Sequence, residues 1–204
     1  MIELEIPQIE PVAEDGTYAK YEAGPLQAGY GVTTVMSTND PQDALVMPTR
    51  LGVIYDGRLV QVASPDEVRR APHNLDAAMA TGDCYTLLAS VERDTDGYWL
   101  AQPADNESPR FRYRAWASSL SAYVGRQVTV GLRPSDVSID PNGSVTARVT
   151  RSIPGQAVGV MAEIAGRRVG VVGGVGAGVG VGDLVHLHID RVVVFDPDSG
   201  LAIT

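Results

Sequence analysis

The chain has 204 residues, enough for one large or two small domains that bury a core. Its 25 acidic residues exceed its 16 Lys and Arg residues, and the resulting formal net charge of −9 argues against nucleic acid and anionic membranes as partners. A single cysteine, Cys84, excludes an internal disulfide, and no stretch is apolar for long enough to cross a bilayer. These properties predict a cytoplasmic protein that does not insert directly into a membrane.

The first third of the chain predicts strands that alternate with short helices. Ile2, Leu4 and Ile6 alternate with glutamates, which is typical of a strand with one solvent-exposed face. The β-branched run Val32–Met36 predicts a buried strand. Asp40-Pro41 then supplies an N-cap and a first helical residue, which predicts a short helix ending near residue 47.

A hairpin and a further helix are predicted next. Strands at residues 51–55 and 58–62 flank Asp56-Gly57, a pair that favours a tight type I′ turn. Ser64 and Glu67 have the spacing of a capping box, so we expect a helix to begin after Ser64. Another short helix is expected over residues 74–79.

From Cys84 onward, helical periodicity disappears and short strands follow one another, separated by turn residues. The predicted strands are 84–92, 97–102, 110–116, 126–133, 143–151, 157–164, 167–172, 183–190 and 192–195. Such a series is typical of a sandwich or barrel. We therefore predict an α+β protein, with a truncated α/β fragment in residues 1–83 and an all-β domain in residues 84–204.

Residues 32–72 resemble the end of the nucleotide-binding domain of ABC importers, specifically the sugar-import ATPase subunits of the maltose and glycerol-phosphate type. The residues in register with that family are Thr33, Thr34, Asp40, Ala44, Arg50, Asp56, Gly57, Arg58, Gln61, Pro65, Glu67 and Pro72. The resemblance places Glu10 at the catalytic carboxylate position, and Asn39 stands where the family has its switch histidine.

The second half resembles the carboxy-terminal regulatory domain of the same importers, an OB-like and MOP-like barrel of the transport-associated type. The matching segments are Val130–Val137, which contains Arg133-Pro134, and Phe195–Gly200. This resemblance implies a homodimer formed through the β-domain, with an ABC ATPase or permease subunit as a further partner. It also implies a peripheral location at the inner face of the membrane.

ATP hydrolysis requires loops that grip the nucleotide phosphates, and the 204 residues contain neither GxxxxGK[ST] nor an LSGGQ-like string. Asn39 cannot take the charged form of a histidine. We therefore expect a degenerate relative without ATPase activity, with no catalytic residue and no cofactor, in which Glu10 and Asn39 only mark the family positions.

Other residue clusters predict little chemistry. His186 and His188 lie on one face of a strand without a third ligand, so no metal site is expected. Trp99, Phe111 and the other aromatic residues that interleave with Arg112 and Arg114 are expected to point inward from barrel strands, with the arginines pointing outward. The glycine-rich segment 169–182 favours a hairpin or strand over a phosphate-binding loop.

Two functions remain open from the sequence. The first is a non-catalytic relative of an importer ATPase, linked to sugar import, that works by binding other proteins or a second copy of itself. The second is a sensor that binds a sugar or an oxyanion through its β-barrel. Arg133, Arg148 and Arg151 are the candidate contacts of the regulatory domain for such an anion.

Overall fold

The computed structural model describes residues 33, 35–46, 48–102, 111–115, 118–153, 157–173 and 178–203. The strand predicted at Ile2–Ile6 and the family position Glu10 lie outside the described residues. In the described part of the chain, no helix has both the length and the apolar character needed to cross a membrane.

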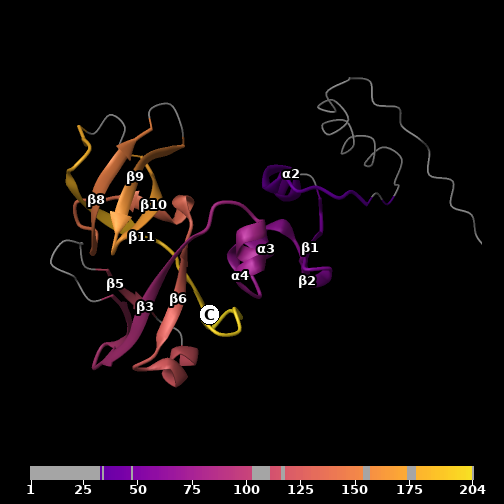
Figure 1. Cartoon of the computed structure of the whole chain (residues 1–204), viewed down its shortest axis with the longest axis horizontal. Helices are drawn as coiled ribbons and strands as arrows, with labels where there is room; N and C mark the ends of the chain where they lie inside the picture. Colours follow the sequence, from indigo (N-terminus) through magenta and orange to yellow (C-terminus); the bar gives the residue numbers. More distant parts are fainter. Residues whose placement is uncertain are drawn as a thin grey trace, which may run out of the picture.

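The N-terminal part, residues 33–83, contains three helices and one hairpin among its described residues (Figure 1). The elements are α2 (Pro41–Val46), β1 (Leu51–Tyr55), β2 (Arg58–Ala63), α3 (Pro65–Arg70) and α4 (Leu75–Ala80). Asp56 and Gly57 join the two strands with φ values of 47° and 70°, the left-handed conformations that a type I′ turn requires. The hairpin prediction is therefore confirmed.

The predicted helix starts are also confirmed. The Ser64 hydroxyl accepts a hydrogen bond of 3.3 Å from the Glu67 amide, and the Glu67 carboxylate accepts one of 3.0 Å from the Ser64 amide. These two bonds form the capping box at the start of α3. At α2, the Asp40 carboxylate accepts a hydrogen bond of 2.8 Å from the Gln42 amide.

The buried strand predicted over Val32–Met36 is wrong for its described residues. Thr33, Val35 and Met36 belong to no strand, and Val35 is 93% exposed. A buried parallel strand requires neighbours on both sides, whereas the described N-terminal part holds only the two-stranded sheet of β1 and β2. The described residues therefore do not form the α/β layer that the sequence predicted.

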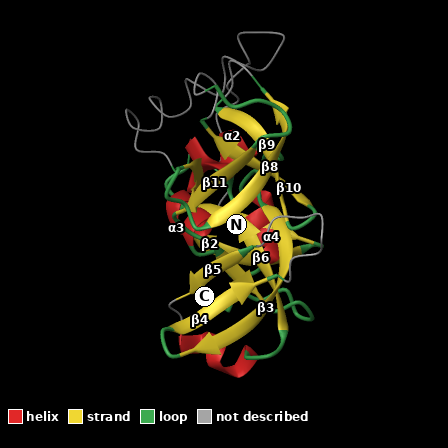
Figure 2. Cartoon of the chain, turned by 90° about the vertical axis from the view of Figure 1, so that its left-hand side faces the viewer, coloured by secondary structure: helices red, strands yellow, loops and turns green. Residues whose placement is uncertain are grey.

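The described residues from Cys84 onward, which we call the β-domain, form a five-stranded antiparallel sheet and a closed five-stranded barrel, placed end to end (Figure 2). The sheet has the order β12-β6-β3-β4-β5, and the barrel has the order β10-β7-β11-β8-β9. The strands are β3 (Tyr85–Asp94), β4 (Gly97–Ala101), β5 (Arg112–Ala115), β6 (Gln127–Leu132), β7 (Val137–Ile139), β8 (Val145–Ser152), β9 (Val158–Ile164), β10 (Arg167–Val172), β11 (Leu184–Ile189) and β12 (Val193–Phe195).

A barrel was predicted, and the structure contains one, but only five of the β-domain strands form it. The strand that the sequence did not predict, β7, is three residues long and pairs in parallel with β10 and antiparallel with β11, which closes the barrel. The 3-10 helix η2 (Pro134–Asp136) precedes it and links it to β6 of the sheet. β7 is too short to show alternation, and its sequence VSI is not the continuous apolar run that marks the equally short β12, VVF.

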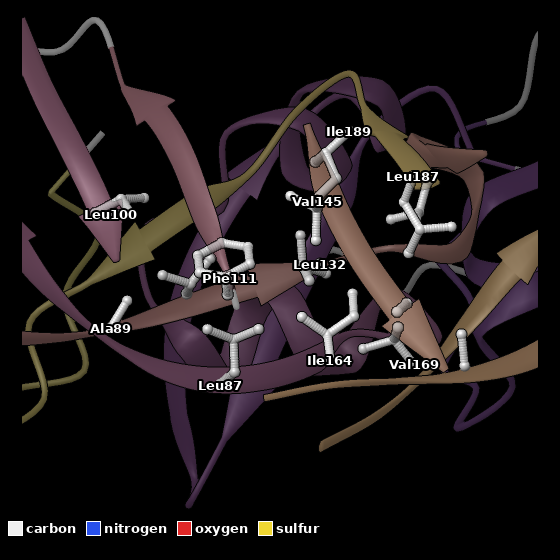
Figure 3. Close-up of a cluster of buried hydrophobic side chains, with 14 of the residues drawn as sticks. Leu87, Ala89, Leu100, Phe111, Leu132, Val145, Ile164, Val169, Leu187 and Ile189 are labelled. Atoms are coloured by element: carbon white, nitrogen blue, oxygen red, sulfur yellow. The ribbon is translucent and has the colours of Figure 1, made fainter. Parts of the chain in front are cut away.

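One hydrophobic core runs through both β units. Leu87 and Leu100 come from the sheet and Leu187 comes from the barrel, and each is at most 2% exposed. Figure 3 shows these side chains converging with Phe111, Leu132 and Ile164 between the strands. Because the core is continuous, the sheet and the barrel stabilise each other.

The end of the chain ties the N-terminal part to the β-domain. The Leu75 amide donates to the carbonyl of Gly200, and the Ala202 amide donates to the carbonyl of His73. A small cluster of Ala78 from α4 with Phe195 from β12 is buried beneath these bonds. Helix α4 is therefore held against the β-domain by backbone pairing and by apolar contact.

Candidate functional site

Arg133 lies between β6 and η2 and is only 7% exposed, which is unusual for an arginine. Its Nη2 donates to the carbonyl of Ala78 at 3.0 Å and to the Thr81 hydroxyl at 2.7 Å. Its Nη1 donates to the carbonyl of Thr81 at 3.4 Å. These acceptors lie at the C-terminal end of α4, where backbone carbonyls have no helical partner. Arg133 thus joins the β-domain to α4.

The surroundings of Arg133 affect its ionisation and that of the nearby thiol. Burial lowers the pKa of the Arg133 guanidinium from its ordinary value, and the positive charge of Arg69 acts in the same direction. Burial also raises the pKa of the Cys84 thiol, an effect that the charge of Arg133 opposes. A thiol with a raised pKa is a poor nucleophile at neutral pH, in keeping with a structural role for Cys84.

A hollow of about 310 Å³ opens next to Arg133. We call it the arginine hollow; its lining residues are Arg69, Arg70, Arg133, Ser135, Asp136 and Arg191. They come from α3, from η2 with the residue before it, and from the segment between β11 and β12. The Arg69 Nη2 donates to the Ser135 hydroxyl at 2.8 Å, which ties α3 to the β-domain.

The arginine hollow concentrates positive charge in a chain whose formal net charge is −9. Four guanidinium groups line it against the single carboxylate of Asp136. Arg70 also lies 3.7 Å from Asp66, but both side chains are mostly exposed, so this pair holds Arg70 only weakly. Chemically, the arrangement favours groups with several negatively charged oxygens.

The three arginines named as candidate anion contacts lie in two different places in the structure. Arg133 lies beside the arginine hollow, whereas Arg148 and Arg151 are exposed on β8 of the barrel. Arg148 donates to the carbonyl of Gly182 at 3.3 Å. The family position Asn39 is exposed in the segment before α2.

The prediction for the aromatic residues of the sheet is correct for Phe111 and wrong for Trp99. Phe111 is fully buried in the core, whereas Trp99 lies on the same face as the arginines. The guanidinium of Arg112 stacks over the Trp99 ring at 4.1 Å from its centroid. A cation is attracted to the face of an indole ring, and this contact covers the ring without placing it in the core.

The two strand histidines are exposed on one face of β11, as predicted. His188 Nε2 lies 3.0 Å from the Asp190 carboxylate, so Asp190 is the hydrogen-bond partner of His188. Among the residues that the structure describes, no three His, Cys, Asp or Glu side chains are grouped closely enough to hold a metal ion.

The sequence did not single out Arg69, Arg70 or Arg191. A pair of adjacent arginines in an acidic chain was a signal that could have drawn attention to α3. Arg191 gave no such signal, because it lies far from α3 in sequence and the fold alone brings it to the arginine hollow.

Comparisons with known proteins identify several relatives of the chain, although no protein-family model matches it. It is 30% identical over 127 residues to a spermidine/putrescine import ATP-binding protein of Pseudomonas fluorescens, covering 62% of this chain and 32% of the relative. It is 32% identical over 117 residues to a trehalose/maltose import ATP-binding protein of Thermococcus litoralis, covering 55% and 30%. A sulfate/thiosulfate import ATP-binding protein of Mycobacterium bovis is 33% identical over 122 residues, covering 59% and 35%.

The chain is similar to ATP-binding subunits of ABC importers. The similarity lies in its C-terminal portion, and the chain spans about a third of the length of the curated relatives it matches. Those relatives carry the names of chemically different cargoes, namely polyamines, sugars and sulfate. The comparisons therefore support a general link with ABC import.

Proposed function

We propose that this chain is a non-catalytic relative of importer ATP-binding subunits, which acts by binding other proteins and does not hydrolyse ATP. The proposal rests on two observations taken together. The chain is similar to import ATP-binding proteins, yet its 204 residues contain no phosphate-binding GxxxxGK[ST] loop and no LSGGQ-like string. Positioning and charge neutralisation of the phosphates supply nearly all of phosphoryl-transfer catalysis, so a chain without these loops lacks the means of turnover.

The β1–β2 hairpin supports a binding role. Ile54, Leu59 and Val62 occupy its outer face, and they are 71%, 63% and 42% exposed. A two-stranded sheet with an exposed apolar face gains free energy when another surface covers it. The relatives are about three times as long as the segment matched here, and we propose that a complete ATP-binding subunit covers this face.

The β-domain is proposed to form a homodimer and to carry the regulatory role. Its support is the resemblance of Val130–Val137 and Phe195–Gly200 to the transport-associated domain, together with the closed barrel, which β7 enters at Val137. The proposed location is the cytoplasmic face of the inner membrane, reached through a permease or ATPase partner.

The proposed cargo of the associated importer is a carbohydrate. The support is the resemblance of residues 32–72 to sugar-import subunits, together with a trehalose/maltose import protein among the relatives. Co-purification with a polyamine, iron or sulfate importer in place of a sugar importer would contradict this assignment.

Three measurements on the full chain test the proposal. ATP hydrolysis is expected at the no-protein background, and a magnesium-dependent turnover on the order of 1 per second would overturn the non-catalytic assignment. Light scattering after size exclusion is expected to give about twice the 21.6 kDa of one chain. A pull-down from the source cell is expected to recover an importer subunit, and Leu59→Glu on the hairpin is expected to abolish this recovery without changing the dimer mass.

A further inference from the structure

The arginine hollow holds more positive charge than its own contacts neutralise. Arg133 donates hydrogen bonds to uncharged acceptors of α4 and of Thr81, and Arg69 donates one to the neutral hydroxyl of Ser135. Asp136 is the single carboxylate among the described lining residues, so the lining holds a formal excess of three positive charges, of which the exposed Arg70–Asp66 pair offsets one. Each of these contacts orients a guanidinium group, but a neutral acceptor does not cancel its charge.

The like charges face each other across a junction. Arg69 and Arg70 belong to α3 in the N-terminal part, whereas Arg133 and Arg191 belong to the β-domain. Burial lowers the pKa of the Arg133 guanidinium, and the like charge of Arg69 acts in the same direction. A multivalent anion bound between the two pairs of arginines would attract both pairs and offset their mutual repulsion.

The geometry and lining narrow the chemical class of the ligand. Guanidinium groups match the oxygens of phosphate and sulfate through paired N–H donors, and the Ser135 hydroxyl adds a further polar contact. A volume of about 310 Å³ lies at the small end of the range for ligand sites and exceeds the needs of one tetrahedral oxyanion. Large apolar side chains are missing from the described lining, so the hollow offers little apolar surface to bury a hydrophobic ligand.

We propose that the arginine hollow is a binding site for a small multivalent oxyanion of the phosphate class, and that the bound anion clamps α3 onto the β-domain. The site lies outside the barrel, at the contact between the two parts of the chain. It does not depend on the importer link, because it follows from the charges and contacts of this chain alone.

The test measures thermal unfolding of the full chain during titration with sodium phosphate and sodium pyrophosphate, with sodium chloride keeping the ionic strength constant. A ligand of the folded state raises the Tm as its concentration exceeds the Kd. Pyrophosphate is expected to raise the Tm at about tenfold lower concentration than phosphate, because it carries more charge and fills more of the hollow. Constant ionic strength removes general screening as an explanation.

The double variant Arg69→Gln/Arg191→Gln is expected to weaken pyrophosphate binding by at least about tenfold, or ~1.4 kcal/mol. The matched control is Arg148→Gln/Arg151→Gln, which changes the net charge equally at exposed positions on β8 and is expected to bind within about twofold of the natural chain. If the double variant does not fold, Arg191→Gln alone serves, because among the described residues Arg191 makes no hydrogen bond or ion pair that joins the two parts.

Three results would overturn the proposal. The first is a Tm that does not respond to either anion beyond the chloride control. The second is an equal loss of binding in the β8 control, which would reduce the effect to net charge. The third is an unchanged Kd in the variant of the arginine hollow. Any of these leaves the proposed importer link intact, since that link is tested by ATPase and pull-down measurements.

Discussion

Replacing Arg133 with methionine tests whether this buried arginine joins the two parts of the chain. Methionine keeps an apolar stem of similar length but cannot donate to α4, so the Thr81 carbonyl and hydroxyl lose their bonds from Arg133, and the Ala78 carbonyl keeps only its bond from the Thr81 hydroxyl. Hydrogen bonds that involve a charged group contribute roughly 1.5–3 kcal/mol each. We count only the two shorter bonds, at 2.7 and 3.0 Å, and subtract the relieved cost of burying the guanidinium. The expected loss of unfolding free energy is about 2–4 kcal/mol.

The assay is urea unfolding at neutral pH, followed by far-UV circular dichroism and by tryptophan fluorescence. Arg148→Met is the matched control, because Arg148 also donates to a backbone carbonyl but is exposed. Its expected loss is within about 0.5 kcal/mol. Equal losses in the two variants, or a loss below ~1 kcal/mol for Arg133→Met, would refute the account of Arg133 as a structural link.

Three further changes have expected outcomes. A Cβ at Gly143 would lie 2.3 Å from the backbone of Leu187, so Gly143→Ala is expected to lower the unfolding free energy by at least ~2 kcal/mol in the same urea assay. Ser64→Ala removes the cap of α3 and is expected to cost about 1 kcal/mol, seen as faster amide exchange in α3. Hydrogen bonds from the backbone and hydroxyl of Ser199 hold the pKa of Asp196 below its ordinary 3.8. This group therefore stabilises the fold above pH ~4 and loses its contribution as pH falls through the folded pKa, and Asp196→Asn is expected to flatten that part of an acid-unfolding curve.

These changes have their own controls. Gly52→Ala introduces the same methyl group where the nearest side-chain atom is 3.4 Å away, so it is expected to leave stability within ~0.5 kcal/mol. A Gly143→Ala variant as stable as Gly52→Ala would contradict the close approach of the two segments. An unchanged acid-unfolding profile in Asp196→Asn would show that other carboxylates account for the acid response.

Much of the local structure could be predicted because its signals lie within a few residues. Asp56-Gly57 specifies its turn through the φ values that these two residues tolerate, and Ser64 with Glu67 completes a cap over three positions. The alternation in β11 predicted which histidines face outward. Such features depend on neighbouring residues and need no knowledge of the rest of the fold.

The errors arose where a distant segment decides the outcome. Val35 carries strand-forming chemistry but is exposed, because the described structure offers it no neighbouring strand. Trp99 has the size of a core residue, yet Arg112 from the next strand covers its face. Of the candidate site, only Arg133 could be named in advance, and its role as a link to α4 was not foreseen.

By itself, the sequence determined the hairpin, the helix caps, the strand-rich second half and the lack of phosphate-gripping loops within these 204 residues. Only the tertiary structure decided that the strands divide into a sheet and a barrel with a shared core, and that Arg69, Arg133 and Arg191 meet beside α3. The physical reason is the distance along the chain over which each interaction acts. Turn and cap energies depend on adjacent dihedral angles, whereas the closure of a barrel and the potential of a charge cluster depend on groups far apart along the chain.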